Sequence, residues 1–310
     1  MNNNYWMILL FCLGLLCVGV NSFADAVPFS QTEKNMKSIL KYRERAREGA
    51  SFMIPNPAEV HTAEEMFRLL LMLSPTSPKV KEAVDALGFS VTSFLNGSEL
   101  IYIVMEKEGC RKGRGFFLVR EKGDIPVLLE APHAGDDALT GNIVISLFLE
   151  HNVKAVAMNV VSRSQVDLAH VPVSYFQAVS LAFAKIYPRG IILQVHGFDM
   201  GKRNPDAPKD SHIIVTNGTR SPGQMLYTLC KSLKTALKIS ALLYPVDTKQ
   251  LGATRNAQAN LLSREGFSGF IHIEISKEWR EKLSVNAPLR ALFFKSIPFL
   301  SPEVQPPLSG

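Results

Sequence analysis

The sequence predicts an α/β fold with a mixed, largely parallel central sheet, helices on both faces of that sheet and a helical N-terminal region. Two observations support this prediction. Over the roughly 200 residues after position 98, short apolar runs alternate with helix-like segments, which is typical of a sheet covered by crossover helices. Of all residues, 46% are hydrophobic and 20% are charged, a balance that fits a globular chain with a sizeable core.

An apolar segment near the start of the chain is too short to span a bilayer. Trp6 to Val20 is an almost unbroken run of roughly 15 apolar residues, whereas a membrane-spanning helix needs ~20. Small residues at Ala24 and Ala26 suit the cleavage positions of a secretory signal peptide. We therefore expect residues 1–26 to be removed and the mature protein to be periplasmic or secreted, with no stable membrane insertion. An uncleaved membrane anchor is the alternative.

Residues 27–98 form the expected helical region. Gln31–Ala50 is rich in Lys, Arg and Glu and indicates a surface helix. Thr62 and Glu65 form a capping box before the apolar run Met66–Leu73, so a second helix is expected to begin there. Lys79–Leu87 indicates a third, short helix. This region contains no obvious catalytic pattern.

Residues 99–310 form the expected α/β domain. Short apolar runs bounded by glycine and charged turns indicate strands at 100–105, 115–119, 126–129, 154–161, 191–195, 213–216 and 269–275. Helices are expected at 141–150, 173–184, 224–238, 258–264 and 289–294. In open sheets of this kind, ligands bind at the carboxyl ends of the strands.

Charge and cysteine content argue against two classes of function. The net charge is +6, and the Lys and Arg residues are scattered rather than arranged in a stripe, which argues against nucleic-acid binding. Cys12 and Cys17 lie in the expected signal peptide, which leaves Cys110 and Cys230 in the mature chain. Their spacing does not match a cysteine-based zinc site, and whether they form a disulfide is open.

Metal-competent side chains fall at three predicted strand ends. His133 follows one strand in a loop of small residues that also contains Asp136 and Asp137, His196 follows another directly, and Glu274 lies near the end of a third. A catalytic zinc typically takes three His or carboxylate ligands and leaves the fourth position to water. We therefore predict that His133, Asp137 and His196 bind one zinc ion. Asp136 is the alternative carboxylate ligand.

Glu274 is the predicted catalytic carboxylate. Zinc lowers the pKa of its water toward ~7, and a nearby carboxylate that is not a ligand can take up the proton and return it to the leaving amine.

Each candidate residue of this site also has a purely structural interpretation. A single His at a strand end is often a core residue, and either aspartate can be the N-cap of the following helix. An unpaired carboxylate inside an apolar strand is harder to explain structurally, because its burial is costly.

A second polar cluster follows the predicted strand 154–161. It contains Asn159, Arg163, Asp167 and His170. Arg163 is expected to bind a substrate carboxylate through parallel hydrogen bonds, or else to form an ion pair with Asp167. Asn159 and His170 are further candidates for contact with the substrate.

These motifs resemble the N-formylglutamate amidohydrolase group, itself similar in plan to the zinc carboxypeptidases. The matching pieces are Pro132-His133-x-Gly135, Arg163-x-x-x-Asp167-Leu168, His196 at a strand end, and Glu274 with Arg280 six residues later. They lie between residues 130 and 280, about half the chain. The resemblance implies a zinc-carboxypeptidase-like fold, with His133 and His196 as zinc ligands, Glu274 as the catalytic carboxylate and Arg163 as a substrate-binding residue. Ala169-His170 departs from the Asn-Arg typical of the amidohydrolases, which leaves the substrate open.

Together these observations predict an exported zinc-dependent hydrolase, either an amidohydrolase or a carboxypeptidase-like peptidase. Its expected substrate is a small acidic, peptide or peptidoglycan-like molecule with an amide or peptide bond. The alternative is a non-catalytic exported binding module that retains the hydrolase fold.

Overall fold

The computed structural model describes residues 29–202 and 211–298. The expected signal peptide, residues 1–26, lies outside this part of the chain, so its presence stays a prediction. Within the described ranges, no helix combines the length and the apolar character that crossing a bilayer requires. Cys110 is exposed, Cys230 is buried, and both are free thiols rather than a disulfide.

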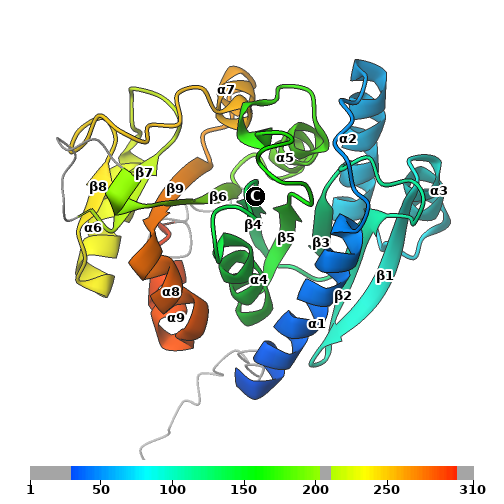
Figure 1. Cartoon of the computed structure of the whole chain (residues 1–310), viewed down its shortest axis with the longest axis horizontal. Coiled ribbons are helices and arrows are strands. Elements are labelled where there is room, and N and C mark those ends of the chain that lie inside the picture. The colour runs from blue at the N-terminus through cyan, green and yellow to red at the C-terminus, as the bar shows by residue number, and fades with distance from the viewer. Residues whose placement is uncertain (1–28, 203–210, 299–310) are drawn as a thin grey trace, which may run out of the picture.

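A single mixed sheet forms the centre of the molecule (Figure 1). In the described part of the chain it has nine strands in the order β1-β2-β3-β5-β4-β6-β9-β7-β8. The strands are β1 (Phe89–Asn96), β2 (Glu99–Glu106), β3 (Phe116–Arg120), β4 (Ile125–Ala131), β5 (Val153–Met158), β6 (Ile191–Phe198), β7 (Ile213–Thr216), β8 (Ala241–Leu243) and β9 (Phe270–Ser276). The four central strands β5, β4, β6 and β9 are parallel, and antiparallel pairs flank them. The predicted mixed, largely parallel sheet is confirmed.

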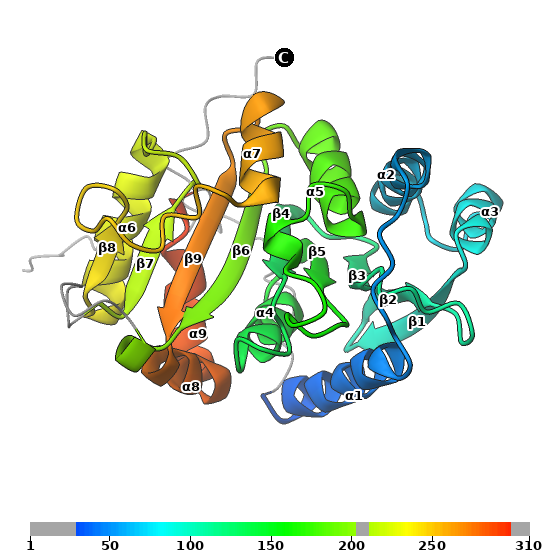
Figure 2. The ribbon, with the colours of Figure 1, turned by 45° about the horizontal axis from the view of Figure 1, so that its top comes forward.

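Helices cover both faces of the sheet, as expected from the alternating pattern. Helices α2 (Pro57–Met72), α5 (Tyr175–Ile186) and α7 (Ala257–Arg264) lie over one face (Figure 2). The other face is covered by α1 (Phe29–Arg47), α4 (Thr140–Glu150), α8 (Lys277–Val285) and α9 (Ala287–Lys295). Helix α3 (Pro78–Ala86) packs on α2, and α6 (Gln224–Leu237) packs on α9.

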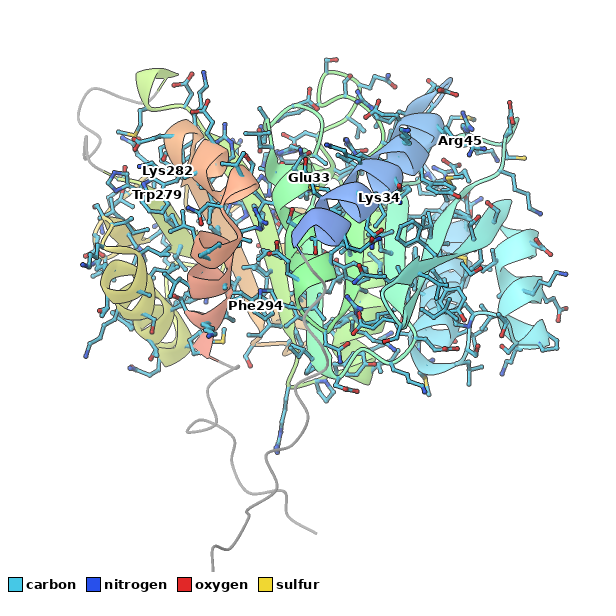
Figure 3. The ribbon with its side chains drawn as sticks, turned by 90° about the horizontal axis from the view of Figure 1, so that it is seen from below. Glu33, Lys34, Arg45, Trp279, Lys282 and Phe294 are labelled. Atoms are coloured by element: carbon cyan, nitrogen blue, oxygen red, sulfur yellow. The ribbon has the colours of Figure 1, made fainter. Side chains whose placement is uncertain are left out.

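Helix α1 shows how the N-terminal region is attached to the sheet domain. It packs against α4 with Ile39 fully buried, while Glu33, Lys34 and Arg45 lie on its exposed side (Figure 3). The Ser146 hydroxyl of α4 donates to the Met36 sulfur. The buried stripe of α1 contains Ile39 and Ala46 together with the polar residues Thr32, Asn35 and Arg43, and its outer side is charged, as expected for a surface helix.

The second helix begins earlier than the capping box predicts. Helix α2 begins at Pro57, and the Asn56 side chain accepts a hydrogen bond from the Glu59 amide. Asn is a favoured N-cap and Pro fits the first helical turn, so this pair determines where the helix begins. Thr62 lies inside the helix and its hydroxyl donates to the Ala58 carbonyl.

The helical region is also shorter than expected, because residues 89–96 form strand β1. This strand pairs with β2 along its whole length, from Phe89 opposite Glu106 to Asn96 opposite Glu99. The region expected to be helical as far as residue 98 therefore ends with α3 at Ala86. Strand β8 and helix α8 were likewise not expected from the sequence.

The parallel centre positions the polar residues of the candidate site. Strand β6 lies between β4 and β9, and the register sets His196 beside Glu274, Gln194 beside His272, and Gln194 beside Glu130. Residues two apart on a strand share a face, so these side chains project from the same side of the sheet.

Candidate metal centre

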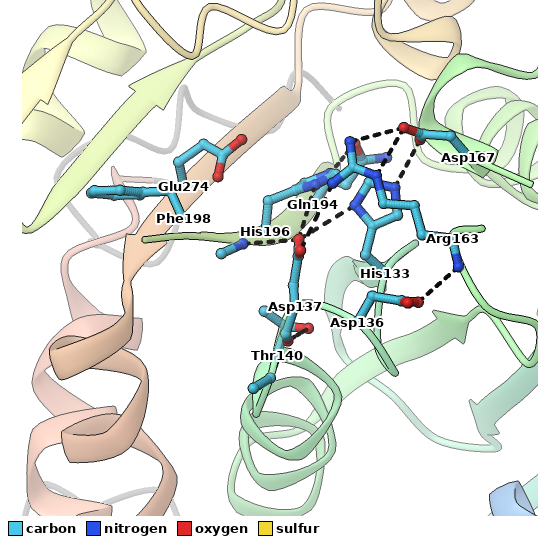
Figure 4. Close-up of polar contacts among 12 residues, drawn as sticks. His133, Asp136, Asp137, Thr140, Arg163, Asp167, Gln194, His196, Phe198 and Glu274 are labelled. Atoms are coloured by element: carbon cyan, nitrogen blue, oxygen red, sulfur yellow. Dashed lines mark hydrogen bonds and ion pairs between the residues drawn. The ribbon is translucent and has the colours of Figure 1, made fainter. Parts of the chain in front are cut away.

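Three of the predicted ligands come together at the carboxyl ends of β4 and β6 (Figure 4). The Oδ2 atom of Asp137 lies 3.3 Å from His133 Nδ1 and 3.6 Å from His196 Nδ1. The two imidazole rings are 4.8 Å apart between centroids. His133 and His196 are 1% and 4% exposed, so the group is enclosed by protein.

A tight turn after β4 brings Asp137 to this position. The amides of Asp136 and Asp137 both donate to the His133 carbonyl, and the Thr140 hydroxyl and amide both bind the Asp137 carbonyl. Leu139 has a positive φ of 71°, a conformation that costs a side chain like leucine about 1 kcal/mol. The loop therefore holds some backbone strain where it delivers the carboxylate.

The distances from Asp137 Oδ2 to the two imidazole nitrogens fit a tetrahedral metal. Metal bonds of ~2.0–2.1 Å in tetrahedral geometry separate neighbouring ligand atoms by about 3.3 Å. The two distances to Asp137 Oδ2, 3.3 Å and 3.6 Å, agree with this value. The chemistry of the donors, two imidazoles and one carboxylate, is also that of catalytic zinc sites. These residues therefore fit a zinc ion.

The far nitrogen of each imidazole has its own partner. His133 Nε2 lies 2.8 Å from the carboxylate of Asp167, and His196 Nε2 lies 2.9 Å from the amide oxygen of Gln194. Both partners are acceptors for a proton on Nε2, which leaves the Nδ1 atom of each imidazole facing Asp137 and within reach of a metal bound there. Outer partners of this kind are typical of metal-ligating histidines.

The protonation states of His196 and Asp137 suit metal binding, whereas a metal has to compete with a proton at His133. Burial would lower the pKa of His133, but its hydrogen bonds with Asp137 and Asp167 outweigh it and raise that pKa. Burial lowers the pKa of His196 to about 4, which leaves its imidazole neutral at physiological pH. Burial would raise the pKa of Asp137, but hydrogen bonds from His133 and His196 outweigh it and hold that pKa well below its usual range. The Gly197 amide adds a 3.0 Å hydrogen bond to Asp137 Oδ2. Asp137 is therefore ionised.

The structure distinguishes between the two candidate aspartates. Asp136 is exposed, and its carboxylate accepts a 2.9 Å hydrogen bond from the Arg163 amide. Asp137, not Asp136, faces the two imidazoles. Of the two alternatives, Asp137 has the position of a ligand.

Glu274 lies beside His196 on the neighbouring strand, as Figure 4 shows. Its Oε1 atom is 3.3 Å from His272 Nε2, and its side chain is only 12% exposed. Burial would raise the pKa of Glu274, but the hydrogen bond and charge of His272 outweigh it and lower that pKa. Glu274 is thus an ionised carboxylate next to the candidate ligands.

His196, His272 and Glu274 form a second group with metal-ligand spacing. Both groups include His196. Because its Nε2 atom donates to Gln194, only its Nδ1 atom is available to bind a metal, so His196 can be a ligand in one of the two groups but not in both at once. His272 Nδ1 is buried and has no hydrogen-bond partner among the described residues. The ring of His272 therefore lacks the outer partner that holds His133 and His196, which favours the group containing Asp137.

A pocket of about 330 Å³ opens over these residues. Its lining includes the candidate ligands, His272 and Glu274, together with Arg163, His170, Arg255 and Asn256. Asn159, a predicted substrate contact, is not part of this lining. It is buried, and its side-chain oxygen accepts a hydrogen bond from the Val161 amide, so its role there is to hold the chain after β5.

Arg163 combines both interpretations of its role. Its Nε and Nη2 atoms lie 3.0 Å and 2.8 Å from Asp167 Oδ2, which is the expected ion pair. Its side chain is nevertheless 45% exposed and lines the pocket. His170 shares the same carboxylate, with Nδ1 3.1 Å from Asp167 Oδ2. Asp167 is therefore the common partner of His133, Arg163 and His170.

Arg280 connects the segments that carry the site. Its guanidinium donates to the carbonyls of Ala138, Phe198 and Ile275, at 2.7, 3.1 and 2.5 Å. It fills the space beside Gly197, where an added Cβ would lie only 2.3 Å from it. Arg280 thereby ties the metal loop to the ends of β6 and β9.

Sequence reasoning did not select Gln194, Asn256 or His272 as site residues. Gln194 and His272 each stand two positions before a selected residue inside an apolar strand, which places them on the same face. A polar residue at such a position is the signal that could have identified them. Asn256 caps helix α7, and its amide also donates to Gln194.

Comparisons with known proteins give distant similarities. No protein-family model matches the sequence, and no curated protein sequence matches it. The structure is similar to that of a gene product of Agrobacterium tumefaciens, with 11% identity and a TM-score of 0.43, over 58% of this chain and 92% of that one. It is similar to N-formylglutamate amidohydrolase from Ralstonia eutropha, with 11% identity and a TM-score of 0.40, over 60% of this chain and 98% of that one. It is also similar to a predicted carboxypeptidase of Burkholderia mallei, with 12% identity and a TM-score of 0.38, over 72% of this chain and 68% of that one.

Two of these structures bear the names of the two groups that the sequence resembles. The identities and TM-scores are too low to transfer an activity, so function has to be inferred from the site itself.

Proposed function

We propose that the protein is a zinc-dependent hydrolase that cleaves an amide or peptide bond in a small acidic or peptide substrate. The observation that supports this most directly is the convergence of two imidazole Nδ1 atoms on one carboxylate oxygen at tetrahedral spacing. Each imidazole is held from behind by an acceptor. An ionised glutamate lies beside the group, in the same pocket.

In this proposal His133, Asp137 and His196 hold the zinc ion. Bound there, zinc supplies a Lewis acid that polarises the scissile carbonyl and lowers the pKa of water toward ~7. Glu274 accepts the proton of the attacking water and returns it to the leaving amine, a role that typically contributes 10²–10⁴-fold to the rate. Its lowered pKa keeps it in the proton-accepting form.

The positive charges of the pocket suggest the substrate class. Arg163 and Arg255 are the cationic side chains of the described lining, and guanidinium groups bind carboxylates through parallel hydrogen bonds. The Nη1 atom of Arg163 is not engaged by Asp167 and lies 3.9 Å from Asp137 Oδ1. We therefore propose that a carboxylate of the substrate binds between these arginines, with the scissile bond toward Glu274.

We also propose that the protein is exported and acts in the periplasm or outside the cell. The apolar segment Trp6–Val20, followed by small residues, is the support for this proposal. N-terminal sequencing of protein recovered after expression with the full chain tests it, and the expected mature N-terminus is near residue 26. A chain that retains its first 26 residues would contradict export by cleavage.

Metal analysis combined with two variants tests the activity. Purified protein is expected to contain about one zinc per chain, and His133→Ala is expected to lose it. Glu274→Gln is expected to keep the zinc and to lose most turnover on a panel of acyl-amino acids and short peptides. Absence of zinc from protein grown with ample zinc overturns the proposal. Bound zinc without hydrolysis of any panel member favours a non-catalytic binding module.

A further inference from the structure

A buried chain of hydrogen bonds leads away from His196 into the core. It runs from His196 to Gln194 on the same strand, then to Glu130 on β4 and to Ser180 on α5. Gln194, Glu130 and Ser180 are 0% exposed. Polar groups are costly to bury unless they are hydrogen-bonded, and a buried network whose hydrogen bonds are satisfied holds its members in one arrangement.

One end of Glu130 is occupied by a serine of helix α5. The Ser180 hydroxyl lies 2.7 Å from the Phe176 carbonyl and 2.6 Å from Glu130 Oε1, and both oxygens are within reach of its one hydrogen. The Oε1 atom of Glu130 is thereby held by Ser180, which leaves Oε2 for another partner.

The other end of Glu130 accepts from the neighbouring strand. Burial raises the pKa of Glu130 to about 7, and the hydrogen bonds from Ser180 and Gln194 act against that rise. Whether protonated on Oε1 or ionised, Glu130 has Oε2 as an acceptor. That oxygen takes a 2.8 Å hydrogen bond from the Gln194 amide nitrogen.

The contacts of Gln194 fix the orientation of its amide. The nitrogen donates to Glu130 Oε2 and to Gln258 Oε1, at 2.8 and 3.3 Å. The oxygen accepts from Asn256 Nδ2 and from His196 Nε2, at 2.6 and 2.9 Å. Reversing the amide would set two N–H groups against each other at Asn256 and two oxygens against each other at Glu130. Gln194 therefore presents its oxygen to His196.

We propose that Glu130 is a positioning residue that acts through Gln194 to keep the proton of His196 on Nε2 and its Nδ1 atom free on the side of Asp137. This inference rests on the proposed zinc site for its functional meaning. Glu130 touches neither the proposed ligands nor the pocket. Its effect passes through one amide whose direction it determines.

Substitutions at Glu130 separate positioning from simple packing. Glutamine has the shape of the protonated glutamate, donates to Ser180 through its NH₂ group and accepts from Gln194 through its oxygen, so Glu130→Gln preserves the chain. Glu130→Met has a similar length but cannot accept from Gln194. Gln194→Leu removes the acceptor of His196 directly, and it tests the same link in a different residue.

The first measurement is the tautomer of His196, read from ¹⁵N-labelled histidine signals by NMR on the full chain without metal. Wild type and Glu130→Gln are expected to show His196 protonated on Nε2 alone, whereas Glu130→Met and Gln194→Leu are expected to show both tautomers. His133, whose two ring nitrogens contact Asp137 and Asp167 rather than Gln194, serves as the internal control, and its signals should stay the same in all variants.

The second measurement is zinc affinity by competition with a chelator. Glu130→Gln is expected to stay within about 3-fold of wild type, while Glu130→Met and Gln194→Leu weaken binding roughly 10- to 100-fold, the usual effect of losing an outer partner of a metal-ligating histidine. A single His196 tautomer in both disruptive variants, or a Glu130→Gln protein as impaired as Glu130→Met, overturns the inference. Wild-type protein that binds no zinc overturns the proposed function instead, and the tautomer measurement still decides the role of Glu130.

Discussion

Asp137 Oδ2 accepts a 3.0 Å hydrogen bond from the Gly197 amide, so the carboxylate between the two imidazoles is also fixed to the backbone of β6. The metal loop and the strand that carries His196 are thereby joined through the proposed ligand itself. A neighbouring aspartate, Asp136, lacks this contact and faces the Arg163 amide. The pair offers a matched test of which carboxylate binds metal.

We expect Asp137→Asn to weaken zinc binding by at least roughly 100-fold, because it removes the charge of a direct ligand, and outer partners alone contribute 10–100-fold. Asp136→Asn is expected to change zinc affinity by less than about 3-fold. Chelator competition on both purified variants makes the comparison. Equal losses in the two variants would contradict the assignment of Asp137.

The stability of the protein is expected to depend on pH through Glu130. Its pKa is about 7 in the folded protein and near the ordinary glutamate value of 4.5 when unfolded, so between these values the folded state binds more protons than the unfolded state. The free energy of unfolding therefore falls as pH rises through this window, by an amount on the order of 3 kcal/mol in total.

The variant Glu130→Gln removes this dependence. Relative to wild type, its free energy of unfolding is expected to increase by about 2–3 kcal/mol between pH 5 and pH 8. Urea unfolding of both proteins without metal at the two pH values measures the change. A difference between the two proteins that stays constant with pH would show that Glu130 ionises normally.

The close approach of Arg280 to Gly197 gives a prediction about stability. In Gly197→Ala the new Cβ would lie 2.3 Å from the guanidinium, which must then move away from the three carbonyls that it binds. We expect a loss of about 2 kcal/mol or more in the free energy of unfolding. Gly201→Ala is the control, because its nearest neighbour would be the Asp199 carboxylate at an ordinary 3.5 Å, and it should stay within about 0.5 kcal/mol of wild type.

The two pocket arginines are expected to respond differently to substitution. Arg255→Ala removes a charge from the rim and should raise KM for acidic substrates by roughly 10-fold, about 1.4 kcal/mol of binding, with kcat little changed. Arg163→Ala should lower kcat as well, because Arg163 also holds the Asp167 carboxylate that binds His133. Steady-state kinetics with acidic and neutral versions of one substrate separates the effects. Equal losses on the neutral version would argue against carboxylate recognition.

Much of the fold followed from hydrophobic patterning. Each expected strand and helix within the described residues is present to within a few positions, apart from the earlier start of α2, because continuous apolar runs of this length fit a sheet that is buried on both faces. Strand β1 was missed because its exposed residues and its Ser and Thr side chains weaken the pattern. Helix α8 begins directly after β9 without a turn signal between them, and its charged sequence gives little contrast.

The candidate site was predictable where a residue type and a strand end coincide. His133, His196 and Glu274 meet both conditions, so their proximity could be inferred from parallel topology. The contact of Asp167 with His133 and the role of Gln194 could not be inferred in this way, since they depend on contacts across loops and across the sheet. Asn159 has a suitable side chain after a strand, but it turns inward and binds the local backbone.

The register between β6 and β9 sets His196 beside Glu274. One half of the site is thus built into the ladder of the sheet, while His133 and Asp137 come from a short loop with a strained residue at its end. A zinc ion bound by His196 of the sheet and by His133 and Asp137 of the loop would restrain the motion of that loop relative to the sheet. Slower amide exchange on metal loading should therefore be concentrated in residues 133–139, with the two strands little affected.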